Sequence, residues 1–231
     1  MATKKRYKTI KSVLLISLLL IASFIIYVMI INKNSAHMTI RQKLLKAVYP
    51  AMMWLTKKAG KNSMSLSGSR APLKSIYPLQ VTLNDCTLLN MNDLKGKKIM
   101  LVNSASDCGY TGQYEGLEKL HQQFKDKLVI IAFPANDFKE QEKLDDAEIA
   151  SFCKMNFGVT FPLAQKSIVI NKAGQNEVFK WLTDKSQNGW NNQAPTWNFC
   201  KYMLDENGNL THFFASSVEP TSQEVLDAVS K

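Results

Sequence analysis

The 231-residue chain lacks any pair of cysteines separated by two residues. Its four cysteines are Cys86, Cys108, Cys153 and Cys200. A Cys-x-x-Cys pair is typical of dithiol reductases and of zinc ribbons, so its absence argues against both classes. We therefore expect no metal or other cofactor, and any chemistry that uses two cysteines must rely on the fold to bring them together.

Acidic residues are missing from the first 71 positions. That stretch carries 13 of the 29 Lys and Arg residues, whereas all 19 Asp and Glu residues follow it. The net charge of +10 therefore divides into +13 for residues 1–71 and −3 for residues 72–231. A nucleic-acid-binding domain would carry the basic excess itself, with aromatic residues interleaved, so we expect no nucleic-acid partner.

One long run, residues 12–31, carries no charge and is almost wholly apolar. At 1.5 Å per residue, a helix of that length spans ~30 Å, the thickness of the hydrocarbon core of a bilayer. A cleaved signal peptide is the alternative, but its apolar region is usually ~7 to 15 residues long and precedes a small-x-small site, and none is convincing here. The sequence therefore favours an uncleaved transmembrane signal anchor.

Basic residues on both sides of this run predict its orientation. The basic tail over residues 1–11 holds five Lys or Arg residues, and four more follow soon after the run. Because cytoplasmic flanks carry the excess of Lys and Arg, the denser group predicts a cytoplasmic N-terminus. The rest of the chain is then expected outside the cytoplasm, in the periplasm if the source is a Gram-negative bacterium.

Two segments separate the apolar run from the expected folded domain. Residues 32–60 are a basic juxtamembrane segment, in which the pattern over 38–58 predicts an amphipathic helix. Such a helix either lies on an anionic membrane surface or packs on the folded domain. Residues 61–72, rich in Ser and containing Gly68 and Pro72, predict a linker.

Residues 73–231 predict one α/β domain, because strands alternate with helices over about 160 residues. The expected strands cover 99–103, 128–133 and 167–170, and the expected helices cover 116–124, 145–156, 177–182 and 222–229. Hairpins are expected over 80–89 and at Glu206-Asn207-Gly208. Capping-box spacing marks the starts of two helices, at Asp145 with Glu148 and at Thr221 with Glu224.

Cys108 stands between an expected strand, 99–103, and an expected helix, 116–124. A strand-to-helix turn presents free backbone N–H groups and the positive end of the helix dipole, both of which stabilise a thiolate. The position therefore predicts a reactive thiol with a pKa low enough to give thiolate at neutral pH. A buried structural cysteine is the alternative interpretation.

Three segments, in this order, resemble the glutathione peroxidase family. They are Leu101-Val102-Asn103-Ser104-Ala105-Ser106-Asp107-Cys108-Gly109-Tyr110-Thr111, then Ala132-Phe133-Pro134-Ala135-Asn136-Asp137-Phe138 continued by Gln141-Glu142, and Trp197-Asn198-Phe199. The resemblance implies a thioredoxin-like fold, with a central mixed β-sheet flanked by helices. It also implies an oxidoreductase of the peroxidase class that acts in the response to oxidative stress.

By position, the resemblance assigns the active-site tetrad to Cys108, Gln141, Trp197 and Asn198. The thiolate would attack the O–O bond of hydrogen peroxide or of an organic or lipid hydroperoxide, while amide and indole N–H groups stabilise the developing charge. Without the family match, core packing is the simpler interpretation of Trp197, and turn or helix-start roles suit Gln141 and Asn198.

The resemblance assigns the resolving role to Cys153, on the helix expected over 145–156. In the thioredoxin-dependent branch of the family, a cysteine at this position condenses with the sulfenic acid of the first cysteine. An inert buried thiol is the alternative. Ala135 replaces a cysteine usual in the second motif, and we expect Cys86 and Cys200 to be structural.

The expected reductant is a thioredoxin-like protein. Arginine occurs only at Arg6, Arg41 and Arg70, and lysine poorly replaces the arginine forks that would hold the two carboxylates of glutathione. The stretch 183–195 is short compared with that of tetrameric family members, which implies a monomer. Glutathione-dependent turnover with the same site is one alternative, and a thiol redox sensor or binding module on this fold is another.

Overall fold

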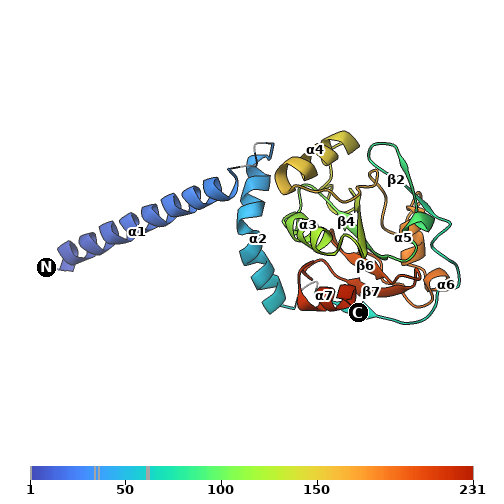
Figure 1. Ribbon diagram of the computed structural model, residues 1–231. Helices are drawn as coiled ribbons and strands as arrows, with labels where there is room; N and C mark the ends of the chain where they lie inside the picture. Colours follow the sequence, from blue (N-terminus) through green and yellow to red (C-terminus); the bar gives the residue numbers. More distant parts are fainter. Residues whose placement is uncertain (1, 34, 36, 61–62, 231) are drawn as a thin grey trace.

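The computed structural model describes residues 2–33, 35, 37–60 and 63–230 (Figure 1). The helices are α1 (Ala2–Ile31), α2 (Ile40–Lys58), α3 (Gln113–Phe124), α4 (Asp146–Phe157), α5 (Glu177–Leu182), α6 (Lys185–Asn188) and α7 (Gln223–Ser230), with a 3-10 turn η1 over Met91–Leu94. The strands are β1 (Ser65–Ser67), β2 (Gln80–Thr82), β3 (Leu88–Asn90), β4 (Lys98–Ser104), β5 (Leu128–Pro134), β6 (Lys201–Leu204) and β7 (Leu210–Phe214).

A five-stranded mixed sheet of order β1-β7-β6-β4-β5 forms the centre of the domain. Strands β4 and β5 run parallel, whereas β4–β6, β6–β7 and β1–β7 are antiparallel. Strands β2 and β3 form a separate hairpin. The mixed sheet with helices on both sides confirms the predicted α/β architecture.

Alternate residues of β4 face the two halves of the core, as the period of a strand requires. Met100 and Val102 join the apolar cluster formed with α3, α4 and α7. Ile99 and Leu101 join the cluster on the opposite face, formed with α5 and the β2–β3 hairpin. Figure 1 shows the same division, with α3, α4 and α7 on one side of the sheet and α5 and α6 on the other.

Most of the predicted elements are present, and two local predictions are wrong. Asp145 caps α4 as expected, with its side chain accepting from the Glu148 N–H at 2.8 Å. Residues 167–170 form no strand, since the pairing there is a single bridge between Ile168 and Gln175. Helix α7 begins at Gln223, so Thr221 lies one position before its N-cap and the predicted capping box of Thr221 with Glu224 is wrong. The carboxylate of Glu224 instead accepts from the Ser65 hydroxyl of β1 at 2.7 Å.

Helix α1 projects away from the domain and carries one candidate membrane span, Ile10–Ile31, of which none is buried (Figure 1). Its length and composition suit a membrane-spanning helix, and a signal sequence near an N-terminus would have the same properties. The predicted apolar run thus forms a continuous exposed helix.

Helix α2 packs on the domain, which was one of the two expected arrangements. Met53 of this helix, and Met38 just before it, are buried in the same apolar cluster as Cys108. A capping box between Thr39 and Gln42 fixes the start of the helix.

The segment predicted as a linker contains β1, which is an edge strand of the sheet. Leu66 lies opposite Phe213 of β7, and the Gly68 N–H donates to the Thr211 carbonyl at 3.0 Å. Gly68 lies against Trp190 so closely that an added Cβ would be 2.4 Å from the indole ring. The folded domain therefore begins before residue 73, because β7 requires a partner that this Ser-rich segment supplies.

Candidate active site

Cys108 lies in the loop between the end of β4 and the start of α3, and its exposed fraction is 1%. Thr111 closes the loop: its hydroxyl accepts from the Cys108 N–H at 3.0 Å and donates to the Ala105 carbonyl at 2.9 Å. The Tyr110 N–H donates to the Cys108 sulfur at 3.3 Å. The predicted backbone donor is therefore present at the thiol.

Asn103, the penultimate residue of β4, ties the first motif to the third. Its side-chain amide donates to the Trp197 carbonyl and accepts from the Cys200 N–H, both at 3.0 Å. Phe199 has a φ of 66°, which is unusual for a bulky residue, and the buried Lys201 ammonium donates to its carbonyl at 2.8 Å. These bonds hold Trp197 and Asn198 at the end of β4 beside the Cys108 loop.

Gln141 joins the same site from the second motif. Its carbonyl accepts from the Asp107 N–H and its side-chain oxygen accepts from the Asn198 amide, both at 3.0 Å. Lys139 and Glu140 precede it with φ values of 52° and 51°, a left-handed backbone that costs about 1–3 kcal/mol per residue. Because the Gln141 oxygen accepts from Asn198, the Gln141 amide nitrogen is left to donate to another group.

The pKa of Cys108 differs from the sequence prediction. Burial raises the pKa of its thiol above the ordinary value, while the Tyr110 N–H, hydrogen bonds from Trp197 and Asn198, and the charge of Arg41 act in the opposite direction. The prediction of a lowered pKa is wrong because it assumed an open strand-to-helix turn. In the structure α2 covers that turn and removes it from water.

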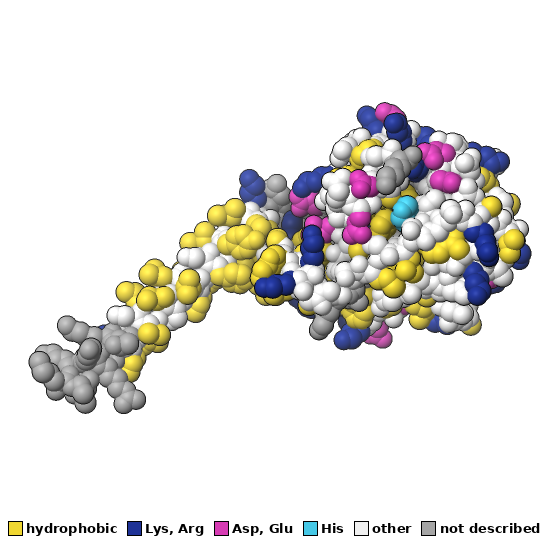
Figure 2. Space-filling view, turned by 90° about the horizontal axis from the view of Figure 1, so that it is seen from below, with side chains coloured by type: hydrophobic (Ala, Val, Ile, Leu, Met, Phe, Trp, Pro, Cys, Tyr) yellow, Lys and Arg dark blue, Asp and Glu magenta, His cyan; other side chains and the backbone are white. Residues whose placement is uncertain are grey.

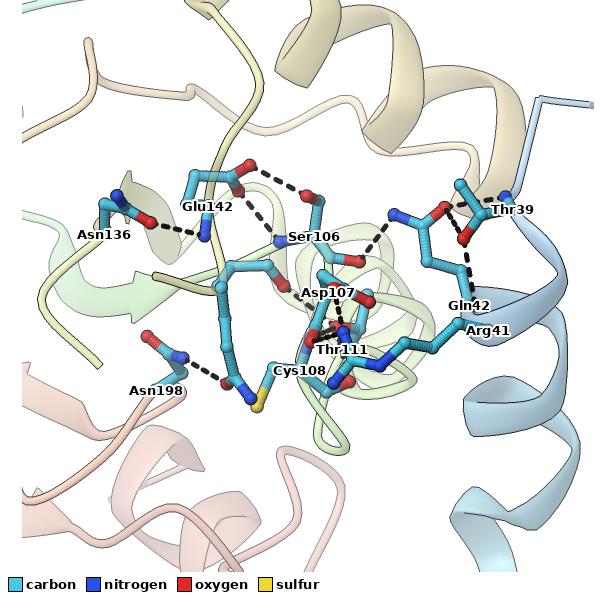
Figure 3. Close-up of polar contacts among 12 residues, drawn as sticks. Thr39, Arg41, Gln42, Ser106, Asp107, Cys108, Thr111, Asn136, Glu142 and Asn198 are labelled. Atoms are coloured by element: carbon cyan, nitrogen blue, oxygen red, sulfur yellow. Dashed lines mark hydrogen bonds and ion pairs between the residues drawn. The ribbon is translucent and has the colours of Figure 1, made fainter. Parts of the chain in front are cut away.

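Arg41 and Gln42 of α2 hold the Cys108 loop from outside the domain. The Arg41 guanidinium pairs with the carboxylate of Asp107, and the Gln42 amide donates to the Ser106 carbonyl at 3.2 Å (Figure 3). Only about 10 Å³ of space remains between this helix and the loop, about what one water molecule needs. Local sequence patterns could not predict this role, because Arg41 lies 66 positions before Asp107.

Glu142 is a further site residue whose role the sequence did not show. It is fully buried and accepts from both the N–H and the hydroxyl of Ser106, each at 2.8 Å. Burial raises its pKa to about 7, against the opposing effect of the Ser106 bonds. In the sequence, Glu142 is notable only because it continues the second motif.

Cys153 lies on α4, in the same apolar cluster as Cys108, with no exposed surface. Burial raises the pKa of its thiol to about 12; Tyr114 acts to lower it and the Glu142 carboxylate acts to raise it further. All four cysteines are free thiols. Both candidate redox cysteines therefore lie in one apolar core, Cys108 in the loop before α3 and Cys153 on α4.

The other two cysteines have different surroundings. Cys200 is buried, with its sulfur 3.4 Å from the Ser216 hydroxyl. Cys86 is exposed in the β2–β3 turn with a φ of 67°. Within the described part of the chain, no three His, Cys, Asp or Glu side chains gather in a way that would hold a metal ion.

The glutathione peroxidase family model matches residues 76–183. The glutathione peroxidase-like peroxiredoxin GPX5 of Chlamydomonas reinhardtii is 43% identical over 158 residues, which are 66% of this chain and 96% of that relative. The chain belongs to the glutathione peroxidase family. Membership in this family confirms the resemblance read from the three motifs, and with it the assignment of the protein as a peroxidase.

Solved structures agree with this family. The crystal structure of Trgpx in its apo form is 28% identical, with a TM-score of 0.53 over 69% of this chain and 97% of its own. A thioredoxin family protein from Chlorobium tepidum, 14% identical with a TM-score of 0.50 over 71% and 96%, shares the fold alone. The predicted thioredoxin-like fold is confirmed.

The shared region leaves the N-terminal third of the chain without a counterpart. GPX5 is matched over 96% of its length by 66% of this chain, so it has no room for α1 and α2. The helix that covers the Cys108 loop is therefore an addition to a glutathione peroxidase core.

Proposed function

We propose that this protein is a membrane-anchored thiol peroxidase that reduces hydrogen peroxide and organic or lipid hydroperoxides during oxidative stress, with Cys108 as the attacking residue. The observation that supports this role is the set of donors around one sulfur. Trp197 and Asn198 donate hydrogen bonds to the Cys108 sulfur, and Gln141 lies beside them, with its side-chain oxygen accepting from the Asn198 amide.

In the first step, the Cys108 sulfur attacks one peroxide oxygen as the O–O bond breaks. The product is a sulfenic acid at Cys108, and the leaving oxygen departs as water or an alcohol after it takes up the thiol proton. Because burial raises the pKa of the Cys108 thiol, removal of this proton is a necessary part of the first step. The amides and the indole N–H stabilise the charge on sulfur and on the leaving oxygen.

In the second step, the Cys153 thiol attacks the sulfenic sulfur, which forms a Cys108–Cys153 disulfide and releases water. Cys153 is fully buried and its pKa is about 12, so α4 must open locally before this thiol can react. A dithiol protein then returns two electrons and two protons to the pair.

A thioredoxin-like protein is the reductant that the site favours. Of the arginines whose side chains the structure describes, Arg41 lies at the Cys108 loop. Its guanidinium already pairs with the carboxylate of Asp107. A specific dicarboxylate site for glutathione therefore lacks a free arginine fork. The name peroxiredoxin, given to the GPX5 relative, supports the same choice.

A turnover assay of the full chain in detergent tests the reductant. We expect steady peroxide consumption with thioredoxin and its NADPH-dependent reductase as the only electron source, and much slower consumption with glutathione and glutathione reductase. Equal rates would mean that the glutathione alternative holds. No turnover with either, together with a peroxide reaction no faster than that of free cysteine, would favour a redox sensor.

For the anchor, we propose that α1 spans the membrane as an uncleaved signal anchor, with the catalytic domain outside the cytoplasm and monomeric. Exposed Cys86 is a native reporter of this topology. A membrane-impermeant maleimide should label it in spheroplasts, and the Cys86→Ser variant should remain unlabelled. Labelling only after lysis would place the domain in the cytoplasm.

A further inference from the structure

Helix α2 has two apolar faces. The face toward the domain carries Leu45, Tyr49, Met52 and Met53. The opposite face carries an apolar stripe at spacings of four, four, three and four, which places its members on one side of a helix. The stripe consists of Ile40, Leu44, Val48, Ala51 and Leu55, all of them exposed.

The inner face lies directly on the Cys108 loop. An added Cβ at Gly112 would be 2.6 Å from the Tyr49 ring, and one at Gly109 would be 2.9 Å from the Met52 sulfur. Gly109 and Gly112 are therefore the residues that allow this close approach. Whatever fixes the position of α2 thus also fixes the position of the loop.

The outer stripe lies on the side of α2 from which α1 leaves. The Tyr27 hydroxyl of α1 donates to the Ala47 carbonyl at 3.1 Å, and Asn32, which follows α1, donates to the Lys43 carbonyl at 3.1 Å. Figure 1 shows α2 running crosswise at the base of α1, between α1 and the domain. If α1 spans a bilayer, the stripe faces that bilayer.

The charge of α2 suits an anionic lipid surface. Lys57 and Lys58 are exposed at its end, and no acidic residue occurs in the first 71 positions. Trp54, 62% exposed, lies between the outer stripe and a pocket that it lines with Val218 of the domain, and Lys58 lies over its ring. Tryptophan is enriched at membrane interfaces. Figure 2 shows hydrophobic side chains along the rod of α1, with Lys and Arg side chains where the rod meets the domain.

We propose that the outer face of α2 lies in the interface of an anionic bilayer while its inner face holds the Cys108 loop, so that α2 seats the peroxidatic site on the membrane surface. This inference rests on the proposed anchor. A lipid surface is favoured over a protein partner because anything covering the stripe would have to share the space into which α1 enters the membrane. The loop would then lie about one helix diameter, ~10 Å, from the lipid.

Trp54 provides a direct measurement in the full chain. The protein is reconstituted into nanodiscs of phosphatidylglycerol with brominated acyl chains, and its tryptophan fluorescence is compared with that of Trp54→Phe. We expect a quenched component in the wild type that is lost in Trp54→Phe and is smaller in phosphatidylcholine discs. Equal quenching of the two proteins would overturn the proposal, and equal quenching in the two lipids would overturn the role given to the lysines.

A matched pair of substitutions tests the stripe while the reporter Trp54 stays in place. Leu55→Glu, in the stripe, should reduce the quenching of Trp54, whereas Leu88→Glu, equally exposed in the distant hairpin, should leave it unchanged. Failure of the protein to enter the discs would overturn both the anchor and this proposal. Entry without quenching of Trp54, or quenching that is absent until two copies share a disc, would overturn the α2 proposal alone.

Discussion

Cys108 and Cys153 are both buried in one apolar cluster, yet their surroundings differ in kind. Around Cys108, a backbone N–H, two side-chain donors and a guanidinium all act against the effect of burial on its pKa. Around Cys153, Tyr114 alone does so and the Glu142 carboxylate adds to the effect of burial. Burial by itself thus yields an inert thiol, and donors aimed at the sulfur make it a candidate nucleophile.

The largest effect is expected from removal of the first thiol. Cys108→Ser should abolish peroxidase activity, because a serine hydroxyl with a far higher pKa is no comparable nucleophile. Peroxide consumption by the purified full chain measures this. Cys86→Ser, at an exposed site, is the control and should retain activity; substantial activity in Cys108→Ser would place the chemistry on another thiol.

Removal of the second thiol should separate the two steps. Cys153→Ser should react once with peroxide at close to the wild-type rate, then stop as a sulfenic acid or proceed to the sulfinic acid. Thioredoxin-driven turnover should be lost while the single burst survives, as followed by stopped flow and by mass spectrometry of the Cys108 peptide. Full turnover in this variant would require a one-cysteine cycle or a role for Cys200.

The donors around Cys108 should each contribute to its rate. Replacing Gln141, Trp197 or Asn198 singly by Ala should slow the oxidation of Cys108 by about 10² to 10³, the usual loss for one donor in such a site. Stopped-flow oxidation measures the rate, and circular dichroism confirms that the variants are folded. Unchanged rates in all three variants would make them structural residues only.

The raised pKa of Cys108 predicts a rate that depends on pH. The thiolate is the attacking form, so the oxidation rate should rise about tenfold per pH unit while the pH stays below the pKa. Between pH 6 and pH 8, the stopped-flow rate should therefore rise steeply. A flat profile over that range would show that the resting residue is already a thiolate.

Glu142, which binds Ser106 of the Cys108 loop and raises the pKa of Cys153, should make stability depend on pH. Its folded pKa of about 7 exceeds the ordinary 4.5, so the folded state keeps a proton that the unfolded state loses. Its stabilising contribution is complete below pH 4.5 and falls as the pH rises to 7, by about 3 kcal/mol. Denaturant unfolding of wild type and Glu142→Gln should show this change in their difference, and a constant difference would contradict it.

The sequence predicted those parts of the site that depend on local pattern. Cys108 was placed between a strand and a helix because β4 is a short apolar run and α3 an amphipathic one, and both elements are present. The resemblance of the second and third motifs to the family predicted Gln141, Trp197 and Asn198 together. Their convergence depends on Asn103, which the first motif includes but whose bonds to the third motif only the fold reveals.

The remaining errors involve contacts between distant segments. Ser65–Ser67 has the composition of a linker, and it forms a strand because β7 offers an open edge. The prediction of a lowered pKa for Cys108 is wrong for a similar reason. Helix α2 covers the Cys108 loop although it lies more than 60 positions earlier in the sequence. Neither local composition nor periodicity contains that information.

Strand β1 also determines where the enzyme can be separated from its anchor. A cut at residue 72 would remove β1 and strip α2 from the Cys108 loop. The edge of β7 that faces β1 would then be open, while its other edge stays paired with β6. An open edge of this kind promotes association between sheets of different molecules. A cut between α1 and α2 would keep both elements, so proteolytic shedding of an intact peroxidase requires cleavage within the few residues that join the two helices.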